Sequence, residues 1–412
     1  MIKTFNKDYL PAMALGITVT IGYGTVYYAY AILLPYMAKD LGIGLSQAFG
    51  FLSIGVFVGG LIMPVWGHIV DRFGGKWLMT MGAVLSGLTL IPLAFVTNNY
   101  ELLGAIALAE VFGLSILYSV AFPSVTRLKL SVTPQQSISI ITLFGGVAST
   151  IFWPSTLALY QNIGWANTWL VWGVVLIVVC APLNFYALNR PEHDVKSNAK
   201  NQPLPYALVA KQDRNKALFR MVASFVFAGY VMGALMTLWV TNLQDLGHTA
   251  AIAATAGAVI GPFKTIGRFA EMLISKNLYP LVTYYLSVGL MVSGLVAVLT
   301  LGFTVWGVLL AAALYGMGDG IKTIANGTLP LALFGGQGYG KLLGWVNLAK
   351  SAFSASSPFV FAWITETYGG WWSFAVMCTC LVVAGLFALG IPDPRKHSGT
   401  TFNIRKSNTK EQ

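Results

Sequence analysis

The sequence predicts an all-α polytopic membrane protein, and three observations support this fold class. Of its 412 residues, 56% are hydrophobic and only 9% are charged, whereas soluble domains carry about 25% charged residues. The apolar residues lie in runs long enough for a spanning helix, which needs about 20 residues. Basic residues gather in alternate loops between these runs. Together these features exclude a soluble globular protein.

Segments for twelve transmembrane helices can be placed along the chain, six on either side of a polar stretch. Those of the first half span 10–36, 46–68, 77–97, 101–124, 137–160 and 166–188. Those of the second half span 217–242, 249–272, 280–302, 304–330, 340–364 and 371–391. The polar stretch holds Pro191, Pro203 and Pro205 and is expected to be a linker. The predicted domains are an N-terminal six-helix bundle, a cytoplasmic linker, a C-terminal six-helix bundle and a cytoplasmic tail, over residues 1–188, 189–216, 217–394 and 395–412.

The net charge of +11 is distributed as expected for a membrane topology rather than for a nucleic-acid surface. With the N-terminus inside, the basic residues of loops and termini fall on the cytoplasmic side, among them Arg72, Arg127, Arg190 and Arg395. The outside loops keep Lys39 alone. This is the positive-inside rule. We therefore expect a multi-pass protein of a bacterial inner (plasma) membrane, with both termini cytoplasmic, a lipid bilayer around it and no nucleic-acid partner.

The two halves of the chain share a repeated motif. Gly67-x-x-x-Asp71 followed by Lys76 recurs 200 positions later as Gly267-x-x-x-Glu271 followed by a second lysine, Lys276. Both copies lie at the predicted cytoplasmic end of the second helix of their half. Parallel repeats of this kind are typical of secondary transporters, whose substrate site lies where the repeats meet.

The longer run Gly67-His-Ile-Val-Asp71-Arg72-Phe-Gly74-Gly75-Lys76 resembles the loop 2–3 signature of the major facilitator superfamily, G-x-x-x-D-R-x-G-x-K/R. The resemblance implies the fold of that family, two pseudo-symmetric six-helix bundles that transport by alternating access. We expect Asp71 to accept hydrogen bonds at a helix N-terminus, where the helix dipole favours an anion. We expect Arg72 and Lys76 to pair across the two halves. The predicted cytoplasmic gate is Gly67, Asp71, Arg72, Gly74, Lys76, Gly267 and Glu271; alternatively, these charges only set the topology.

The sequence shows no site for an energy-supplying nucleotide or for a cofactor. Gly335-x-x-x-x-Gly340-Lys341 imitates a phosphate-binding loop, but Leu342 replaces the required Ser or Thr and no strand precedes it. The four histidines are scattered without metal-binding spacing. We therefore expect no enzyme, no metal and no cofactor, but a monomeric transporter that is ion-coupled (to protons or a counter-anion), an exchanger or a facilitator.

Three helices of the second half carry polar residues at helical spacing, which places them on one face. They are Lys264, Arg268 and Glu271, then Tyr315, Asp319, Lys322 and Asn326, and finally Asn347, Lys350, Ser351 and Ser354. A charge at membrane depth costs about 2.5–3.5 kcal/mol, so it is kept where it lines a pathway or finds a partner. The repeat assigns Glu271 to the gate. Arg268 could pair with Glu271 or point into the pathway.

The predicted charge balance at the bilayer centre is cationic. Lys264, Arg268, Lys322 and Lys350 are expected to face Asp319 and, across the pseudo-twofold axis, Glu110 of the fourth helix. Asp319 can pair with Lys322 one turn away, which leaves at least one cation uncompensated. A substrate anion could supply the missing charge; alternatively, a closed ion-pair network holds the helices together.

Tyrosines face this charge from the first half of the chain. Tyr23, Tyr27 and Tyr30 are predicted on one face of the first helix, and Tyr118 lies two turns below Glu110. Their hydroxyls could donate to a carboxylate while the rings cover its apolar part; alternatively, the stripe serves packing alone.

Within the superfamily, Tyr23-Gly24-Thr-Val-Tyr-Tyr-Ala-Tyr-Ala-Ile-Leu-Leu-Pro35 resembles the first helix of the monocarboxylate and oxalate–formate group. In oxalate–formate exchangers a basic residue on helix eight and a lysine on helix eleven clasp the carboxylates. The resemblance implies these roles for Arg268 or Lys264, and for Lys350. Two departures are that the acidic-Gly-aromatic signature of animal monocarboxylate carriers is missing and that Asp319-Gly-Ile-Lys322 fits no assigned pattern.

The predicted function is secondary active transport of a small organic anion, a carboxylate, by proton coupling or exchange. The predicted binding residues are Lys350, Arg268, Lys264, Lys322, Asp319, Tyr23, Tyr27, Tyr118, Asn326 and Asn347, and Asp319 or Glu110 would carry the proton. One alternative is a proton-driven drug or siderophore exporter; Gly145, Gly146 and Pro154 fit part of its fifth-helix signature, but the closing glycines are missing. The other is an amino-acid permease in which Asp319 binds the amine.

Overall fold

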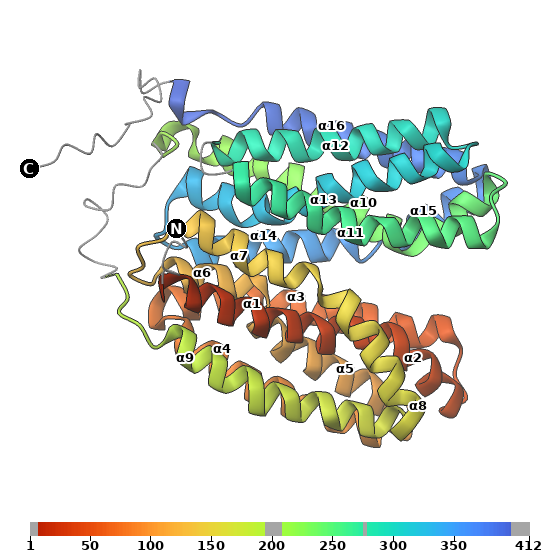
Figure 1. The fold of residues 1–412 in the computed structure, drawn as a ribbon, viewed down its shortest axis with the longest axis horizontal. Helices are drawn as coiled ribbons and strands as arrows, with labels where there is room; N and C mark the ends of the chain where they lie inside the picture. The colour runs from red at the N-terminus through yellow and green to blue at the C-terminus, as the bar shows by residue number, and fades with distance from the viewer. Residues whose placement is uncertain (1–6, 194–207, 275–277, 397–412) are drawn as a thin grey trace, which may run out of the picture.

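The computed structural model describes residues 7–193, 208–274 and 278–396, which form helices apart from one isolated β-bridge between Leu128 and Glu192. The helices are arranged in two bundles that lie as two layers, α1–α9 and α10–α16 (Figure 1). The described chain begins and ends at the same end of the molecule, which we call the terminal end (Figure 1). The all-α polytopic fold class predicted from the sequence is confirmed. The proposed linker residues 194–207 and tail residues 397–412 lie outside the described residues.

The first bundle contains nine α-helices that make up the six predicted passes. They are α1 (Leu10–Tyr23), α2 (Ala29–Asp40), α3 (Leu45–Phe73), α4 (Gly75–Leu90), α5 (Asn99–Gly113), α6 (Tyr118–Thr126), α7 (Pro134–Gly146), α8 (Ala148–Val175) and α9 (Ala181–Leu188). A π-helical turn, Gly24–Tyr28, joins α1 to α2. Within α8 the chain turns at Gly164, whose φ of +77° is open to glycine but rare for other residues. This turn separates the fifth pass from the sixth.

The second bundle supplies the other six passes from seven α-helices. They are α10 (Arg214–Asp245), α11 (Ala250–Ile274), α12 (Pro280–Leu301), α13 (Val305–Phe334), α14 (Tyr339–Ser354), α15 (Ser357–Tyr368) and α16 (Gly370–Leu389). The predicted eleventh span is therefore two helices: α14 ends at Ser354, and α15 begins at Ser357 with Pro358 in its first turn. Pro at a first or second helical position is favourable, since its missing N–H would have no helical partner there.

Nine continuous helical stretches within the described residues are long and apolar enough to cross a membrane. One of them, Pro134–Leu188, has 55 residues; at about 1.5 Å per residue it far exceeds a hydrocarbon core of about 30 Å and accommodates two passes. The spans absent from these nine are α11, which carries the half-buried Lys264, and the pair α14–α15, in which α14 carries the half-buried Lys350 and each helix is short.

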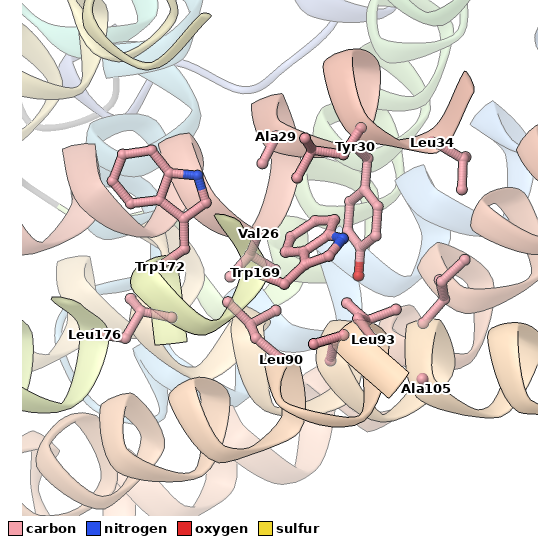
Figure 2. Close-up of a cluster of buried hydrophobic side chains, with 14 of the residues drawn as sticks. Val26, Ala29, Tyr30, Leu34, Leu90, Leu93, Ala105, Trp169, Trp172 and Leu176 are labelled. Carbon is pink, nitrogen blue, oxygen red and sulfur yellow. The ribbon is translucent and has the colours of Figure 1, made fainter. Parts of the chain in front are cut away.

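Each bundle has a hydrophobic core of its own. In the first bundle, Tyr30 packs on Trp169 at 4.9 Å between ring centroids, beside Leu34, Leu90 and Leu93 (Figure 2). A core in the second bundle gathers α10, α12, α13 and α16 around Leu235, Met291 and Phe374. A third cluster is shared: Val125 and Ile138 of the first bundle pack with Ile324, Leu331 and Tyr339 of the second. We call this the shared cluster.

The position of Tyr30 corrects one prediction. Its side chain is fully buried in the first bundle and does not join Tyr23 and Tyr27 on one exposed face. The physical reason is the π-helical turn at Gly24–Tyr28, which uses more residues than an α-helical turn and so rotates everything after it to a new direction.

Candidate functional site

The bundles are joined at the terminal end by Asp71, in the last turn of α3. Its carboxylate accepts hydrogen bonds from the backbone N–H groups of Gly340 at 2.8 Å and Lys341 at 2.7 Å, in the first turn of α14. This is the contact that the sequence analysis expected, an anion at a helix N-terminus. Gly67 makes the approach possible, because a Cβ atom there would lie 2.0 Å from the Gly340 carbonyl oxygen.

Within the described ranges neither Arg72 nor Lys76 forms an ion pair with the other bundle, in contrast to the prediction. Lys76 donates to the side-chain oxygen of Asn189 at 2.9 Å, within its own bundle. The Arg72 guanidinium lies over the Phe73 ring, 5.1 Å from its centroid. The cause is Gly74, which has a φ of +81° and ends α3, so that the chain turns back toward its own bundle.

Arg127 is the basic residue that contacts Asp71, and it does so from within the first half of the chain. It pairs with Glu192 at 2.7 Å and donates to the Asp71 backbone carbonyl at 2.6 Å. Backbone hydrogen bonds from Lys129 to Pro191 and from His193 to Arg127 hold the same segments together. In the sequence, Arg127 stands out only as a topogenic charge, and no motif there predicts this pairing.

The second copy of the repeat contacts the other bundle through its carboxylate. Ser139 on α7 donates to the Glu271 carboxylate at 3.1 Å. Gly267, by contrast, packs within its own bundle, where a Cβ atom would lie 2.4 Å from the Met317 carbonyl oxygen. Lys276 lies outside the described residues. The two copies therefore share the bundle-crossing carboxylate but differ in what their glycines contact.

Arg268 also crosses between the bundles. It is buried, donates to the Thr142 backbone carbonyl on α7 at 2.8 Å and reaches the Thr323 hydroxyl at 3.4 Å. The last turn of a helix favours a cation, and Arg268 meets α7 one turn before its end at Gly146. No ion pair with Glu271 exists among the described residues, so that expected alternative is wrong.

Asp319, fully buried on α13, is at the centre of a charge cluster. Its carboxylate pairs with Lys322, one turn away, at 2.7 Å and with Lys264 of α11 at 2.5 Å. The first of these pairs was expected. The second depends on the close packing of α11 against α13, where a Cβ atom on Gly320 would lie 2.1 Å from the Lys264 carbonyl oxygen. One carboxylate is thus shared by two ammonium groups.

Lys350 stands outside that cluster. Among the described residues it forms no ion pair, and its ammonium group reaches the side-chain oxygen of Asn347 only at 3.5 Å. Lys322 and Asp319 are the charged groups close enough to act on it electrostatically. The Asn326 side-chain oxygen on α13 is buried and has no hydrogen-bond partner in the described part of the chain. Lys350 is therefore a cation without a carboxylate partner in this part of the chain.

Glu110 does not face these cations, which corrects the sequence analysis. It lies 3% exposed between α5 and α3, and a Cβ atom on Gly55 would contact its side chain at 3.4 Å. The spacing Gly55-x-x-x-Gly59 allows the two helices to approach closely and enclose the carboxyl group. No ion pair of Glu110 exists within the described ranges, and one carboxyl oxygen has no hydrogen-bond partner there.

The predicted tyrosines lie between the bundles on the side of the first one. The rings of Tyr23 and Tyr27 are 6.3 Å apart, and those of Tyr23 and Tyr118 are 4.9 Å apart. A Cβ atom on Gly145 of α7 would clash with the Tyr118 hydroxyl, and a Cβ atom on Gly146 would lie 2.7 Å from the Arg268 guanidinium. Among the predicted binding residues, the structure thus brings the three tyrosines together, with Tyr118 beside the contact of α7 with Arg268 of α11.

Some contacts at the site were not anticipated from the sequence. Ser139 and Thr142 of α7 and Thr323 of α13 hold Glu271 and Arg268. Thr142 contributes only its backbone carbonyl, which any residue offers, so the residue types of α7 carry no signal for the contact with Arg268.

Two helical bundles that meet around buried charges define a membrane transporter rather than an enzyme. A model of the Major Facilitator Superfamily matches residues 16–337. The chain belongs to this superfamily. It is therefore an integral, multi-pass membrane protein and a secondary transporter.

Two bacterial relatives and one solved structure show how far the similarity extends. The nitrite extrusion protein of Bacillus subtilis is 22% identical over 326 residues, 76% of this chain and 78% of that one. An uncharacterised transporter of the same organism, YcxA, is 24% identical over 220 residues, 51% of this chain and about half (52%) of its own length. The crystal structure of the transporter FucP superimposes with a TM-score of 0.72 at 15% identity, over 94% of this chain and 100% of that one; this likeness shows the fold alone.

Proposed function

We propose that this protein transports a small organic anion with a carboxylate group by alternating access. The observation that carries the proposal is Lys350, a half-buried cation without a carboxylate partner among the described residues. A charge at membrane depth is expensive unless it finds a partner or water. An anionic substrate supplies that partner during transport.

The carboxylate would bind between Lys350 and Lys322, which interact electrostatically with each other. The Lys322 ammonium group has three N–H donors. Its ion pair with Asp319 does not use all of them, so Lys322 can also donate to a second anion. The amides of Asn347 and Asn326 offer further donors, and Tyr23, Tyr27 and Tyr118 face the substrate from the other bundle. These residues support the resemblance to the monocarboxylate and oxalate–formate group, with Lys350 as the lysine of helix eleven.

The basic residue of helix eight in this scheme is Lys264 rather than Arg268. Lys264 reaches the Asp319 carboxylate, beside Lys322. Arg268 already donates to Thr142 across the bundles and is better explained as part of the gate. The Lys264–Asp319–Lys322 cluster is the closed network that the alternative reading requires, but Lys350 lies outside it and needs another explanation.

We propose that the terminal end is cytoplasmic, as the positive-inside distribution requires. Asp71, Glu271 and Arg268 all cross between the bundles toward this end. The described conformation is then closed to the cytoplasm and faces outward. One relative, the nitrite extrusion protein of Bacillus subtilis, is also named for an anion.

Ligand-dependent thermal stabilisation of the purified protein tests the substrate class. Small carboxylates should raise the unfolding temperature, because a ligand stabilises the state that it binds, by about 2.7 kcal/mol at a concentration of 100 Kd. Zwitterionic amino acids and lipophilic cations should have no effect. Stabilisation by amino acids would favour the permease, and stabilisation by lipophilic cations would favour the drug exporter; either result without carboxylate binding contradicts the proposal.

We further propose that Glu110, rather than Asp319, carries the proton. Asp319 is neutralised by two ammonium groups. Glu110 is buried without a cation among the described residues, and burial of an unpaired charge is costly, so its neutral, protonated form is favoured. Release of this proton then requires the bundle to open around α3 and α5.

Glu110→Gln should abolish the accumulation of substrate driven by a pH gradient in proteoliposomes, because glutamine cannot exchange a proton. Exchange of labelled for unlabelled substrate, which needs no net proton movement, should persist. Glu101→Gln is the matched control, since Glu101 is an exposed carboxylate on the same helix. Accumulation by Glu110→Gln equal to that of the wild type would exclude Glu110 as the proton carrier.

A further inference from the structure

Five aromatic side chains of the first bundle form an unbroken chain of ring contacts beside the proposed site. Trp153 contacts Tyr28 at 5.9 Å between ring centroids, Tyr28 contacts Tyr27 at 5.3 Å, and Tyr27 contacts Tyr23 at 6.3 Å. Tyr23 then contacts Tyr118 at 4.9 Å. We call these five residues the aromatic row. They come from α8, the π-helical turn, α1 and α6, so distant parts of the chain converge to build it.

The aromatic row differs from the packed aromatic pair in the core. Tyr30 and Trp169 are both fully buried (Figure 2). Tyr27, by contrast, is 52% exposed although it lies in the middle of the first pass. Tyr27 is therefore not enclosed in the core of its bundle. Half of the Tyr27 side chain is therefore available to another molecule.

Contacts at α7 show where the aromatic row lies. A Cβ atom on Gly145 of α7 would clash with the Tyr118 hydroxyl, and a Cβ atom on the next residue, Gly146, would lie 2.7 Å from the Arg268 guanidinium of the second bundle. The Tyr118 end of the row therefore lies where α7 meets α11, and the row borders the space between the two bundles.

We infer that the transported anion is an aromatic carboxylate, whose carboxylate binds Lys350 and Lys322 while its ring stacks on Tyr23 and Tyr27. This inference rests on the proposed function and specifies its substrate class. Aromatic pairs with centroids 4.5–7 Å apart gain free energy beyond that of burying their area. An aliphatic acid of the same size and charge gains only the burial. The lysines of the second bundle therefore bind the carboxylate of the substrate, and the tyrosines of the first bundle bind its ring.

Binding of three acids to the purified full-length protein tests the inference: benzoate, cyclohexanecarboxylate and acetate. Benzoate and cyclohexanecarboxylate have the same charge and similar size, but only benzoate has an aromatic face. Benzoate should bind about 2- to 12-fold more tightly than cyclohexanecarboxylate, which is the ring–ring contribution expressed as a ratio of Kd. This comparison needs no variant and is independent of any folding defect.

Variants of Tyr27 test whether the preference for benzoate over cyclohexanecarboxylate depends on the ring of this residue. Tyr27→Leu should bind the two ring acids equally, whereas Tyr27→Phe should keep the preference for benzoate. Tyr186→Leu is the matched control, since Tyr186 on α9 is exposed to nearly the same extent, 53%; it should behave as the wild type. Equal affinity of the wild type for both ring acids, or a preference that survives in Tyr27→Leu, would overturn the inference and leave the carboxylate function intact. Failure of all three acids to bind would overturn both.

Discussion

Lys350→Gln is expected to weaken the binding of small carboxylates about 10- to 150-fold. The substitution removes a charge-assisted hydrogen bond, which contributes about 1.5–3 kcal/mol, and each 1.4 kcal/mol is a factor of ten in Kd. Binding measured by titration calorimetry, or by the dependence of the unfolding temperature on ligand concentration, reports this change. Uptake into proteoliposomes at a fixed low concentration should fall with it.

The same substitution separates a binding role from a structural one. Lys350 has no ion-pair partner in the described part of the chain, so its removal leaves no buried charge unpaired and should not lower the unfolding temperature of the ligand-free protein. Lys39→Gln, at the exposed end of α2, is the control for the loss of one positive charge. Unchanged carboxylate affinity in Lys350→Gln, or a large loss of stability without ligand, would contradict the assignment.

Asp319→Asn is expected to have the opposite effect, because it should lower the stability of the ligand-free protein. The substitution leaves the ammonium groups of Lys264 and Lys322 without their shared counter-charge. Removal of one partner from a buried ion pair costs about 3–5 kcal/mol, because the remaining charge stays buried. We expect a free energy of unfolding lowered by about this amount, measured by denaturation of the ligand-free protein.

A double substitution provides the control for Asp319. Asp319→Asn combined with Lys264→Met removes one of the two stranded charges and should recover part of the lost stability. The changes in the free energy of unfolding do not add for substitutions at contacting residues that share one interaction, whereas they do add for substitutions at independent sites. If the two substitutions destabilise the protein by the sum of their separate effects, the three residues do not act as one cluster.

The overall fold could be predicted because it depends on the length and polarity of segments. The apolar runs mark the helical passes wherever the bilayer imposes about 20 residues on each. The contact of Asp71 with the start of α14 was also predictable. A helix N-terminus favours a negative charge, and the motif contains the aspartate that supplies it. The Asp319–Lys322 pair follows equally from one-turn spacing on one helix.

Contacts between helices could not be predicted in the same way. Lys264 reaches Asp319 because Gly320 lets α11 and α13 approach closely, and the sequence alone does not state which glycine meets which helix. Glu110 faces α3 rather than the cations because of a similar close approach at Gly55. Tyr30 was misplaced for a different reason, since helical periodicity does not reveal a π-helical turn.

The shared cluster has a consequence for how the carrier is driven. To open the terminal end, Val125 and Ile138 must separate from Ile324, Leu331 and Tyr339, and newly wetted apolar surface costs about 25 cal/mol per Å². The empty protein should therefore rest in the conformation described above. A ligand shifts that resting equilibrium only by the difference between its affinities for the two conformations. A molecule that binds this conformation alone, however tightly, would arrest the cycle and act as an inhibitor instead of cargo.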